Sequence, residues 1–255
     1  SVVLSGDGGD EIFGGYPIYN TGFLLEKIMK IPVFLRKLLL KATSLGRNET
    51  KVGKINELLS LSLKDKKNFY SEMFTHSRYK PEVYKAWSSQ KLNEALNLAD
   101  NDLSEALRIY DLLSNTLPDN FLVKVDRTSM ANSIEVRSPF LDYRFVEFAQ
   151  RIPNELKVGF NHNKILMREI IKDIVPKAIV DRNKMGFTPP IHTWLDRSIS
   201  AKQFINYTNY LKEFNSDLYD FYIRLFRLDK KNYMSDSYRI KLVIFGKWFE
   251  QYVLQ

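Results

Sequence analysis

The fold of this chain is decided by the stretch SVVLSGDGGDEIFGGY, residues 1–16. It begins with the continuous apolar run Val2 to Leu4, which is typical of a buried strand in a parallel sheet. Five glycines and three acidic side chains follow within the same sixteen residues. Open α/β sheets bind ligands at the carboxyl ends of their strands, and glycines let a ligand approach the backbone closely. The stretch therefore predicts a ligand site where the strand ends.

The common phosphate and metal loops do not match this turn. The dinucleotide fingerprint would need its third glycine at the position of Glu11, and the P-loop pattern lacks its Lys-Ser or Lys-Thr pair. A calcium loop needs oxygen ligands at alternate positions, whereas Gly8 and Gly9 follow Asp7. What remains is a flexible turn that carries acidic side chains.

Two interpretations of Asp10 and Glu11 stay open on the residues alone. Both stand where a helix can begin, and carboxylates stabilise a helix N-terminus through its dipole. Alternatively, carboxylates beside a nucleotide imply Mg²⁺ shared with pyrophosphate oxygens, because they would otherwise repel phosphate. Magnesium takes only one or two protein carboxylates, and in this second interpretation Asp10 is the ligand.

Parallel strands need neighbours, and none is obvious close to residues 2–4. We expect the partner strands to lie upstream of the sequence given, which leaves Val2 to Leu4 unpaired in this chain. An unpaired strand edge is a surface on which a homodimer can form.

Most of the chain after residue 16 has the periodicity of helices. Residues 23–28 begin one stripe that Pro32 breaks, and residues 32–42 begin another. The lysine-rich segment 46–80 suggests small helices over a core. Asp102 and Glu105 form a capping-box pattern, which predicts a helix from Leu103 to Thr116 that stops before Pro118.

The segment from residue 121 to residue 149 is predicted as two helices joined by a loop, EVRSPFLD, at residues 135–142. The first helix places apolar side chains on one face, namely Phe121, Leu122, Val125 and Met130. Asp142 is the expected N-cap of the second helix. The apolar side chains of that helix are Phe145, Val146, Phe148 and Ala149. Within residues 164–180 we expect another helix, which Pro176 ends. The last fifty residues are predicted to form two or three amphipathic helices.

Composition places the chain among globular proteins and excludes several classes. The absence of cysteine from the 255 residues removes disulfides, thiolate metal sites and a cysteine nucleophile. No apolar run is long enough for a membrane span and no signal peptide is visible, so we expect a cytoplasmic protein without a membrane partner. The net charge of +8 comes from scattered lysines, which favours a solvated surface over a nucleic-acid partner.

Four blocks in order, SGDGGDEIFGGY, LVKVDRTSMANSIEVRSPFLD, KILMRE and DRNKMGF, resemble the synthetase domain of glutamine-hydrolysing asparagine synthetases. The resemblance implies an α/β, predominantly helical chain with few strands. Residues 1–255 would be the C-terminal part of an adenine-nucleotide-hydrolase-like (ATP-pyrophosphatase) domain. It also implies ATP and Mg²⁺ as cofactors, and activation of an aspartate carboxylate as its adenylate, which ammonia from glutamine then attacks.

The same resemblance implies roles for particular residues. Ser5 and Gly6 fall on the pair that meets the nucleotide, and Asp7 falls on the acidic position tied to formation of the intermediate. Asp10 falls on the magnesium aspartate. Lys184, in RNKMGF, falls on the catalytic lysine, and a desolvated ammonium there would stabilise the charge that develops during adenylation.

Several other charged residues in these blocks stay without an assigned role. We expect Glu135 and Arg137 to form a buried pair that braces their loop. The remaining residues, either phosphate or carboxylate contacts or structural groups, are Asp126, Arg127, Lys164 and Arg168.

Two parts of the family pattern do not occur in this sequence. These are the serine- and glycine-rich pyrophosphate loop that ends in Asp-Ser, and the glutaminase domain with its N-terminal cysteine. We therefore expect residues 1–255 to be inactive alone and to need the missing region as a partner.

Two alternatives to an aspartate-amidating ligase remain. A related enzyme could amidate another carboxylate, such as a sugar acid of a surface glycan, or close a lactam ring. A noncatalytic basic module, for example one that binds RNA, would leave Asp7, Asp10 and Lys184 without a shared purpose.

Overall fold

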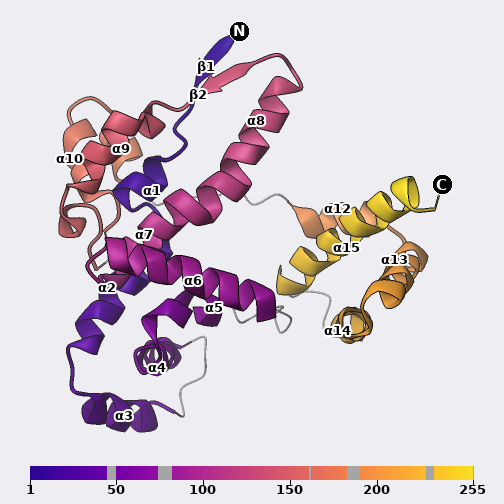
Figure 1. Ribbon diagram of the computed structural model, residues 1–255, viewed down its shortest axis with the longest axis horizontal. Coiled ribbons are helices and arrows are strands. Elements are labelled where there is room, and N and C mark those ends of the chain that lie inside the picture. Colours follow the sequence, from indigo (N-terminus) through magenta and orange to yellow (C-terminus); the bar gives the residue numbers. More distant parts are fainter. Residues whose placement is uncertain (45–49, 74–81, 161, 183–189, 228–232, 255) are drawn as a thin grey trace. The chain divides into compact units, whose positions relative to one another are not determined.

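The structure is a computed structural model that describes residues 1–44, 50–73, 82–160, 162–182, 190–227 and 233–254. In these ranges the chain is mostly helical and has a single sheet of two strands (Figure 1). It divides into two compact units. Unit 1 is residues 1–75 with 81–184, and unit 2 is residues 76–80 with 185–255. The expectation of a predominantly helical chain with few strands is confirmed for the described residues.

Unit 1 contains both strands and the helices that surround the N-terminal turn. Its elements are β1 (Val2–Leu4), α1 (Gly9–Phe13), α2 (Pro17–Met29), α3 (Val33–Ala42), α4 (Lys51–Leu61), η1 (Lys66–Asn68), α5 (Phe69–Met73), α6 (Glu82–Leu98), α7 (Leu103–Ser114), η2 (Leu117–Leu122), α8 (Val123–Met130), β2 (Glu135–Arg137), η3 (Pro139–Leu141), α9 (Tyr143–Gln150), η4 (Asn154–Leu156), α10 (Ile165–Ile171) and α11 (Lys177–Val180). Unit 2 contains α12 (Ile191–Ser198), α13 (Ala201–Phe214), α14 (Ser216–Arg227) and α15 (Tyr233–Tyr252).

The two strands pair in parallel, with Val3 opposite Val136. Figure 1 shows them side by side, with α8 leading into β2. Residues 135–142, predicted as a loop, therefore begin with a strand, and β1 has a partner inside this chain. Both predictions were wrong because a strand of three residues before Ser-Pro is too short to show a period of two.

The side chains of β1 are exposed rather than buried. The exposed fractions are 54% for Val2 and 74% for Leu4. The prediction of a buried strand was wrong for the described residues, because β2 supplies only hydrogen bonds at one edge. The apolar side chains point from the faces of the sheet, where strand pairing gives no cover.

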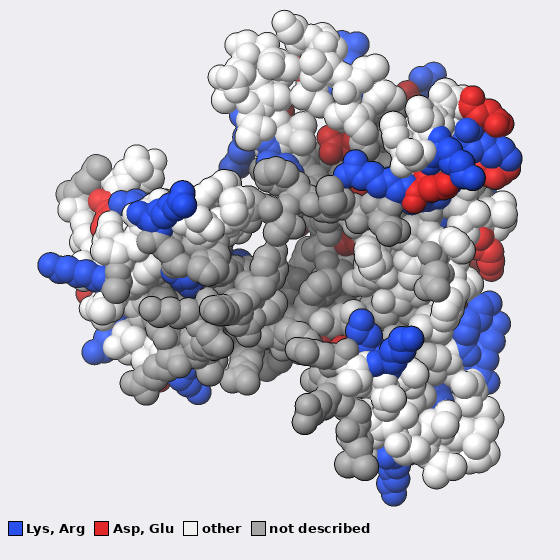
Figure 2. All heavy atoms as spheres, turned by 180° about the vertical axis from the view of Figure 1, so that it is seen from behind, with Lys and Arg blue, Asp and Glu red and all other residues white. Residues whose placement is uncertain are grey.

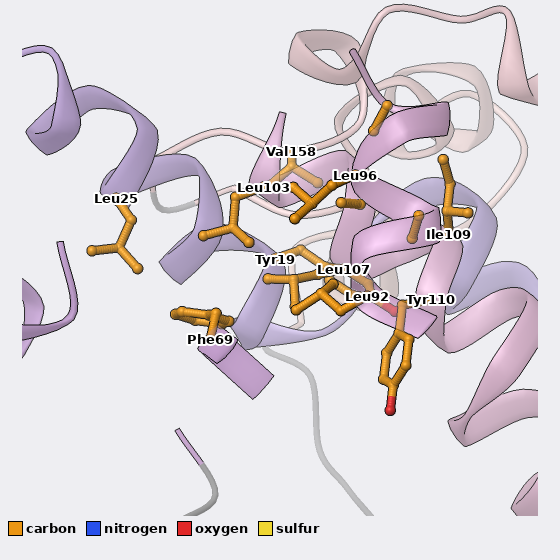
Figure 3. Packing of buried hydrophobic residues seen from close by; sticks show 13 residues of the cluster. Tyr19, Leu25, Phe69, Leu92, Leu96, Leu103, Leu107, Ile109, Tyr110 and Val158 are labelled. Atoms are coloured by element: carbon orange, nitrogen blue, oxygen red, sulfur yellow. The ribbon is translucent and has the colours of Figure 1, made fainter. Parts of the chain in front are cut away.

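Helix α7 forms the centre of unit 1 and packs against α2 and α6. Asp102 caps it, as predicted, by accepting the Glu105 N–H at 2.7 Å. The approach of α2 is close, because a Cβ on Gly22 would lie 2.9 Å from Cα of Ser104. Figure 3 shows the surrounding apolar side chains, which include Tyr19, Leu25, Phe69, Leu92, Leu96, Leu103, Leu107, Ile109, Tyr110 and Val158.

The helix predicted from Leu103 ends before Pro118, as expected, but a further helical turn follows it closely. Helix α7 stops at Ser114, and the π-helical turn η2 starts at Leu117 with Pro118 in its first turn. Proline is tolerated there because the first N–H groups of a helix have no partner within it. The chain then continues directly into α8.

Helices α8 and α9 bury less apolar surface than the sequence predicts. No residue of α8 is buried, and Met130 is 57% exposed. Asp142 caps α9, as predicted, by accepting the Arg144 N–H at 3.0 Å. In α9 only Ala149 is fully buried, whereas Phe148 is 62% exposed.

Unit 2 is built from amphipathic helices, which confirms the prediction for the end of the chain. Its core includes Tyr207 and Leu211 of α13 and Leu242 of α15. A Cβ on Gly246 would lie 2.1 Å from Cγ of Tyr207, so α15 and α13 approach closely at this glycine. Among the described residues, no helix has the length and apolarity that a membrane crossing requires.

Candidate active site at the end of strand β1

The turn after β1 is fixed by backbone hydrogen bonds and by glycine. The Ser5 N–H donates to the Arg137 carbonyl at 2.9 Å, which extends the pairing of the two strands by one step. Gly8 has φ 85°, and a Cβ there would lie 2.3 Å from Cδ2 of Leu141. Only glycine suits this position, for both the backbone and the space. Helix α1 begins at the next residue.

Ser5 joins the two strand ends. Its Oγ donates to Oδ2 of Asp7 at 2.7 Å and lies 2.9 Å from Oγ of Ser138. Ser138 follows β2 directly, so parallel pairing brings both residues to the same edge of the sheet. Sequence reasoning missed Ser138 because it treated this segment as a loop.

Three of the predicted site residues line one small pocket, which we call the β1 pocket. Its volume is about 220 Å³, and its lining residues are Gly6, Asp7, Gly8, Asp10, Glu11, Tyr16, Phe121 and Lys124. This volume lies below the range of about 300–1,000 Å³ that is usual for small-molecule sites. The pocket therefore fits part of a ligand, such as a phosphate group with its cation, rather than a whole nucleotide.

Lys124 brings a positive charge to this acidic pocket. It stands on α8, and its Nζ lies 4.9 Å from the centroid of the Phe121 ring. The sequence pattern gave no specific signal for it, because the side chain lies more than a hundred residues from the glycine-rich turn. The tertiary fold alone brings it there.

Glu11 is the buried acid of the site. Only 1% of its surface is exposed, and Tyr16 donates its hydroxyl to Oε1 at 3.0 Å. Burial raises the pKa of the Glu11 carboxyl, against the lowering effect of this and a backbone hydrogen bond. Burial, together with the nearby Glu11 and Asp10 charges, raises the pKa of Tyr16 well above its usual range. The tyrosine therefore acts as a neutral donor that holds Glu11 in place.

Asp10, the predicted magnesium ligand, lies at the start of α1 with a cation beside it. Nζ of Lys164 is 2.8 Å from Oδ1 of Asp10, and each side chain is 29% exposed. Lys164 precedes α10 directly. The structure thus brings together two residues that lie far apart in the sequence.

Arg108 of α7 anchors the helix that carries Asp10. The guanidinium is fully buried and donates to the carbonyls of Glu11 and Ile12, each at 3.3 Å. It also donates to Oε1 of Glu105 at 2.9 Å and to Oε1 of Gln150 at 2.8 Å. Burial lowers the pKa of Arg108, while the Glu105 charge opposes that shift. One buried cation therefore joins α1, α7 and α9.

The other predicted residues take varied positions. Lys184 lies outside the described residues. Glu135 and Arg137 form an ion pair at 2.7 Å, but their side chains are 55% and 64% exposed, so the expectation of a buried brace was wrong. Residues two apart on a strand point to the same face, so both side chains lie on one face of β2, which is open to solvent.

The remaining charged residues separate into structural and exposed groups. Arg168 donates to the carbonyls of Asn163, at 3.0 Å, and Val180, which ties α10 to α11. Asp126 and Arg127 of α8 are exposed. On the face shown in Figure 2, basic side chains lie at several separate places, one of them interleaved with acidic side chains.

The donor set at the β1 pocket fits magnesium that arrives with a phosphate ligand. Asp7 and Asp10 supply carboxylate oxygens at one pocket, and Mg²⁺ uses one or two protein carboxylates together with water and phosphate oxygens. Within the described ranges, no cluster of three or more His, Cys, Asp or Glu is arranged as a metal cage. The residues suit an ion that shares its coordination with a substrate.

The geometry defines a class of protein, namely one whose ligand site lies at the carboxyl edge of parallel strands next to a glycine-rich turn. The family follows from sequence comparison. The family model described as asparagine synthase matches residues 1–220, so the chain belongs to the asparagine synthase family.

Two relatives illustrate this membership. The putative asparagine synthetase [glutamine-hydrolyzing] 2 of Methanocaldococcus jannaschii is 49% identical over 134 residues, which are 51% of this chain and 26% of the relative. Asparagine synthetase [glutamine-hydrolyzing] 1 of Bacillus subtilis is 31% identical over 208 residues, which are 78% of this chain and 32% of the relative. The chain thus spans about a quarter to a third of the length of these relatives.

A more distant relative carries a different name. Amidase chry2 of Gibberella zeae is 23% identical over 218 residues, which are 76% of this chain and 32% of the relative. No solved structure matches this chain.

Proposed function

We propose that the protein is an ATP-dependent ligase that forms amides. In this proposal the side-chain carboxylate of aspartate attacks the α-phosphate of ATP, giving β-aspartyl-AMP and pyrophosphate. Ammonia from glutamine then displaces AMP and gives asparagine. The observation that carries the proposal is the convergence of Gly6, Asp7 and Asp10 on one pocket at the end of β1, in a chain that belongs to the asparagine synthase family.

Each residue of the site has a stated role in this chemistry. Ser5 and Gly6 approach the nucleotide through the open backbone of the turn. Asp10 holds Mg²⁺, which supplies charge neutralisation at the pyrophosphate oxygens when bound. Asp7, fixed by Ser5, acts in formation of the intermediate. Lys184 stabilises the charge that develops between the carboxylate and the α-phosphate.

The fold proposed for the parent domain is that of the ATP-pyrophosphatases, with residues 1–255 as its C-terminal part. The parallel pair of β1 and β2 and the glycine-rich turn at its carboxyl edge support this assignment. A Ser- and Gly-rich loop ending in Asp-Ser does not occur in residues 1–255. We therefore expect residues 1–255 to be inactive when they are produced alone. The proposed location of the complete protein is the cytoplasm.

Pyrophosphate exchange into ATP tests the first half-reaction. In the full-length parent protein, called the full chain below, we expect aspartate-dependent exchange. Asp10→Asn and Lys184→Ala should each reduce it by at least about a hundredfold, the usual effect of removing one charge-stabilising group. Lys64→Met, which changes an exposed lysine paired with Glu72, serves as the control. Full exchange in either site variant would remove that residue from its role.

The acceptor carboxylate is a second point of the proposal. The relative named amidase chry2 favours testing acceptors other than aspartate. The same exchange assay with a panel of amino acids and sugar acids shows whether aspartate or another carboxylate is the acceptor. Exchange that depends on aspartate alone supports asparagine synthesis, whereas exchange that depends on another carboxylate and not on aspartate assigns the alternative acceptor.

A further inference from the structure

The ion pair between Lys164 and Asp10 has no role in the proposed chemistry. Asp10 lines the β1 pocket, whereas Lys164 is not among the lining residues. Its Nζ nevertheless lies 2.8 Å from Oδ1 of Asp10. The ammonium therefore reaches this carboxylate from outside the pocket. A divalent cation in the pocket would bind the same anionic group.

The backbone holds Lys164 in an unusual conformation. Its φ and ψ are 55° and 39°, in the left-handed region that lysine seldom adopts. The neighbouring Ile165 N–H donates to the Lys157 carbonyl at 3.2 Å. Asn20 of α2 donates to the Gly159 carbonyl at 2.6 Å and fixes the preceding turn. Hydrogen bonds to Lys157 and from Asn20 of α2 thus hold the chain on the two sides of Lys164.

Gly15 shows that a second part of the chain is shaped around this pair. A Cβ at position 15 would lie 1.7 Å from Oδ1 of Asp10 and 2.7 Å from Cε of Lys164. The two side chains therefore meet directly over the backbone of Gly15. A larger residue there would require these side chains to move, so glycine at position 15 leaves the space in which the ion pair forms.

We propose that Lys164 is the resident counter-ion of Asp10 and lowers the affinity of the nucleotide-free protein for divalent cations. The inference rests on the proposed function, which makes Asp10 the magnesium ligand. A cation that binds Asp10 must displace the Lys164 ammonium or tolerate its repulsion. The phosphates of a nucleotide offset both positive charges. Metal consequently enters together with nucleotide rather than before it, and Lys164 is a positioning residue for that order.

Binding of Mn²⁺, measured by electron paramagnetic resonance on the full chain without nucleotide, tests this role. We expect Lys164→Met to bind Mn²⁺ about fivefold more tightly than the wild type, the size of effect that a partly exposed ion pair can give. Lys164→Arg keeps the charge and should bind as the wild type does. Lys172→Met is the matched control, because Lys172 lies just after α10 and pairs with Glu169 at the surface.

Two results would overturn the inference. One is Mn²⁺ binding by Lys164→Met that is equal to or weaker than that of the wild type. The other is an equal gain in Lys172→Met, which would mean a general effect of surface charge. Asp10→Asn separates this inference from the proposed function: if that variant binds Mn²⁺ like the wild type, the assignment of Asp10 as metal ligand fails as well. Loss of binding in Asp10→Asn with no change in Lys164→Met refutes the counter-ion role alone.

Discussion

At the scale of single residues, the glycine-rich turn could be predicted well and its surroundings could not. The strand end, the glycines and the acids within ten residues indicated a ligand site with Asp10 as a candidate metal ligand, whereas the roles of Gly6 and Asp7 came from the family resemblance. Lys124 was missed because its position depends on the path of α8. The residues of the turn itself can be recognised from the local sequence. Side chains from distant segments, such as Lys124, reach the pocket only through tertiary packing.

The glycines of this turn separate a folding requirement from a binding requirement. Gly8→Ala places a Cβ 2.3 Å from Cδ2 of Leu141 at φ 85°, so we expect the free energy of unfolding to fall by about 2 kcal/mol or more. At Gly6 a Cβ would meet no atom within 4 Å, so Gly6→Ala should leave stability nearly unchanged. Urea unfolding measures both variants.

Pyrophosphate exchange completes the comparison of these two glycines. Because Gly6 lines the β1 pocket, the added methyl group of Gly6→Ala would occupy space next to the ligand. Pyrophosphate exchange should therefore be weaker in this variant. A stable Gly6→Ala protein with wild-type exchange would contradict the role of this backbone position. A Gly8→Ala protein as stable as the wild type would contradict the steric account of the turn.

Lys157 is a buried cation whose charge destabilises unit 1. Its side chain is fully buried, its Nζ has no hydrogen-bond partner among the described residues, and burial lowers its pKa from 10.5 to about 8, with the Arg108 charge adding to the shift. Between pH 8 and 10.5 the folded state loses this proton while the unfolded state keeps it, so stability rises with pH in that window. The destabilisation is fully present below pH 8.

Replacing Lys157 by Met should therefore stabilise the protein at pH 7. The gain is about 3 kcal/mol, which follows from a pKa lowered from 10.5 to about 8, because Met has a similar volume and no charge. Urea unfolding at pH 7 and at pH 10 measures it. The variant should lose the rise in stability over that range, and a rise as large as in the wild type would show that another group titrates there.

At the scale of elements, helix caps were predicted correctly and the short strand was not. Asp102 and Asp142 were recognised because an N-cap is a local signal, set by one side chain and the N–H groups that follow it. Strand β2 was missed because its partner among the described residues, β1, lies more than a hundred residues away. The burial of α7 was also missed, since it depends on α2 and α6.

The anchoring of α1 by Arg108 is the structural requirement of the site at this scale. Arg108→Met removes the donors to the Glu11 and Ile12 carbonyls and leaves Glu105 without its partner. We expect a loss of about 3 kcal/mol in the free energy of unfolding, the cost of breaking a buried ion pair from one side. Thermal unfolding of the full chain measures this loss.

Two further measurements make the Arg108 prediction decisive. Pyrophosphate exchange should fall in the folded Arg108→Met protein, because α1 carries Asp10. Lys64→Met removes an exposed partner of Glu72 and should leave both properties nearly unchanged. Equal stability of the two variants would show that α1 does not depend on the buried guanidinium.

At the scale of the whole molecule, the family could be predicted from four sequence blocks, and the comparisons confirm it. The family match ends at residue 220, so it covers unit 1 and reaches into unit 2 only as far as α14. The aligned residues make up 26% and 32% of the two relatives, so those chains are about two to two and a half times as long as residues 1–255. Under the proposed function, we expect the β1 pocket to be the part of the ATP site that this segment contributes.

Transfer of ¹⁸O tests the central claim, adenylation of a carboxylate, most directly. The full chain is given ATP, an ammonia source and aspartate whose side-chain carboxylate carries ¹⁸O, and the nucleotide products are analysed by mass spectrometry. The account predicts one ¹⁸O atom in AMP, because the carboxylate oxygen that attacks the α-phosphate stays with it when ammonia displaces the nucleotide. Formation of ADP with ¹⁸O in inorganic phosphate would contradict it, since the carboxylate would then have attacked the γ-phosphate.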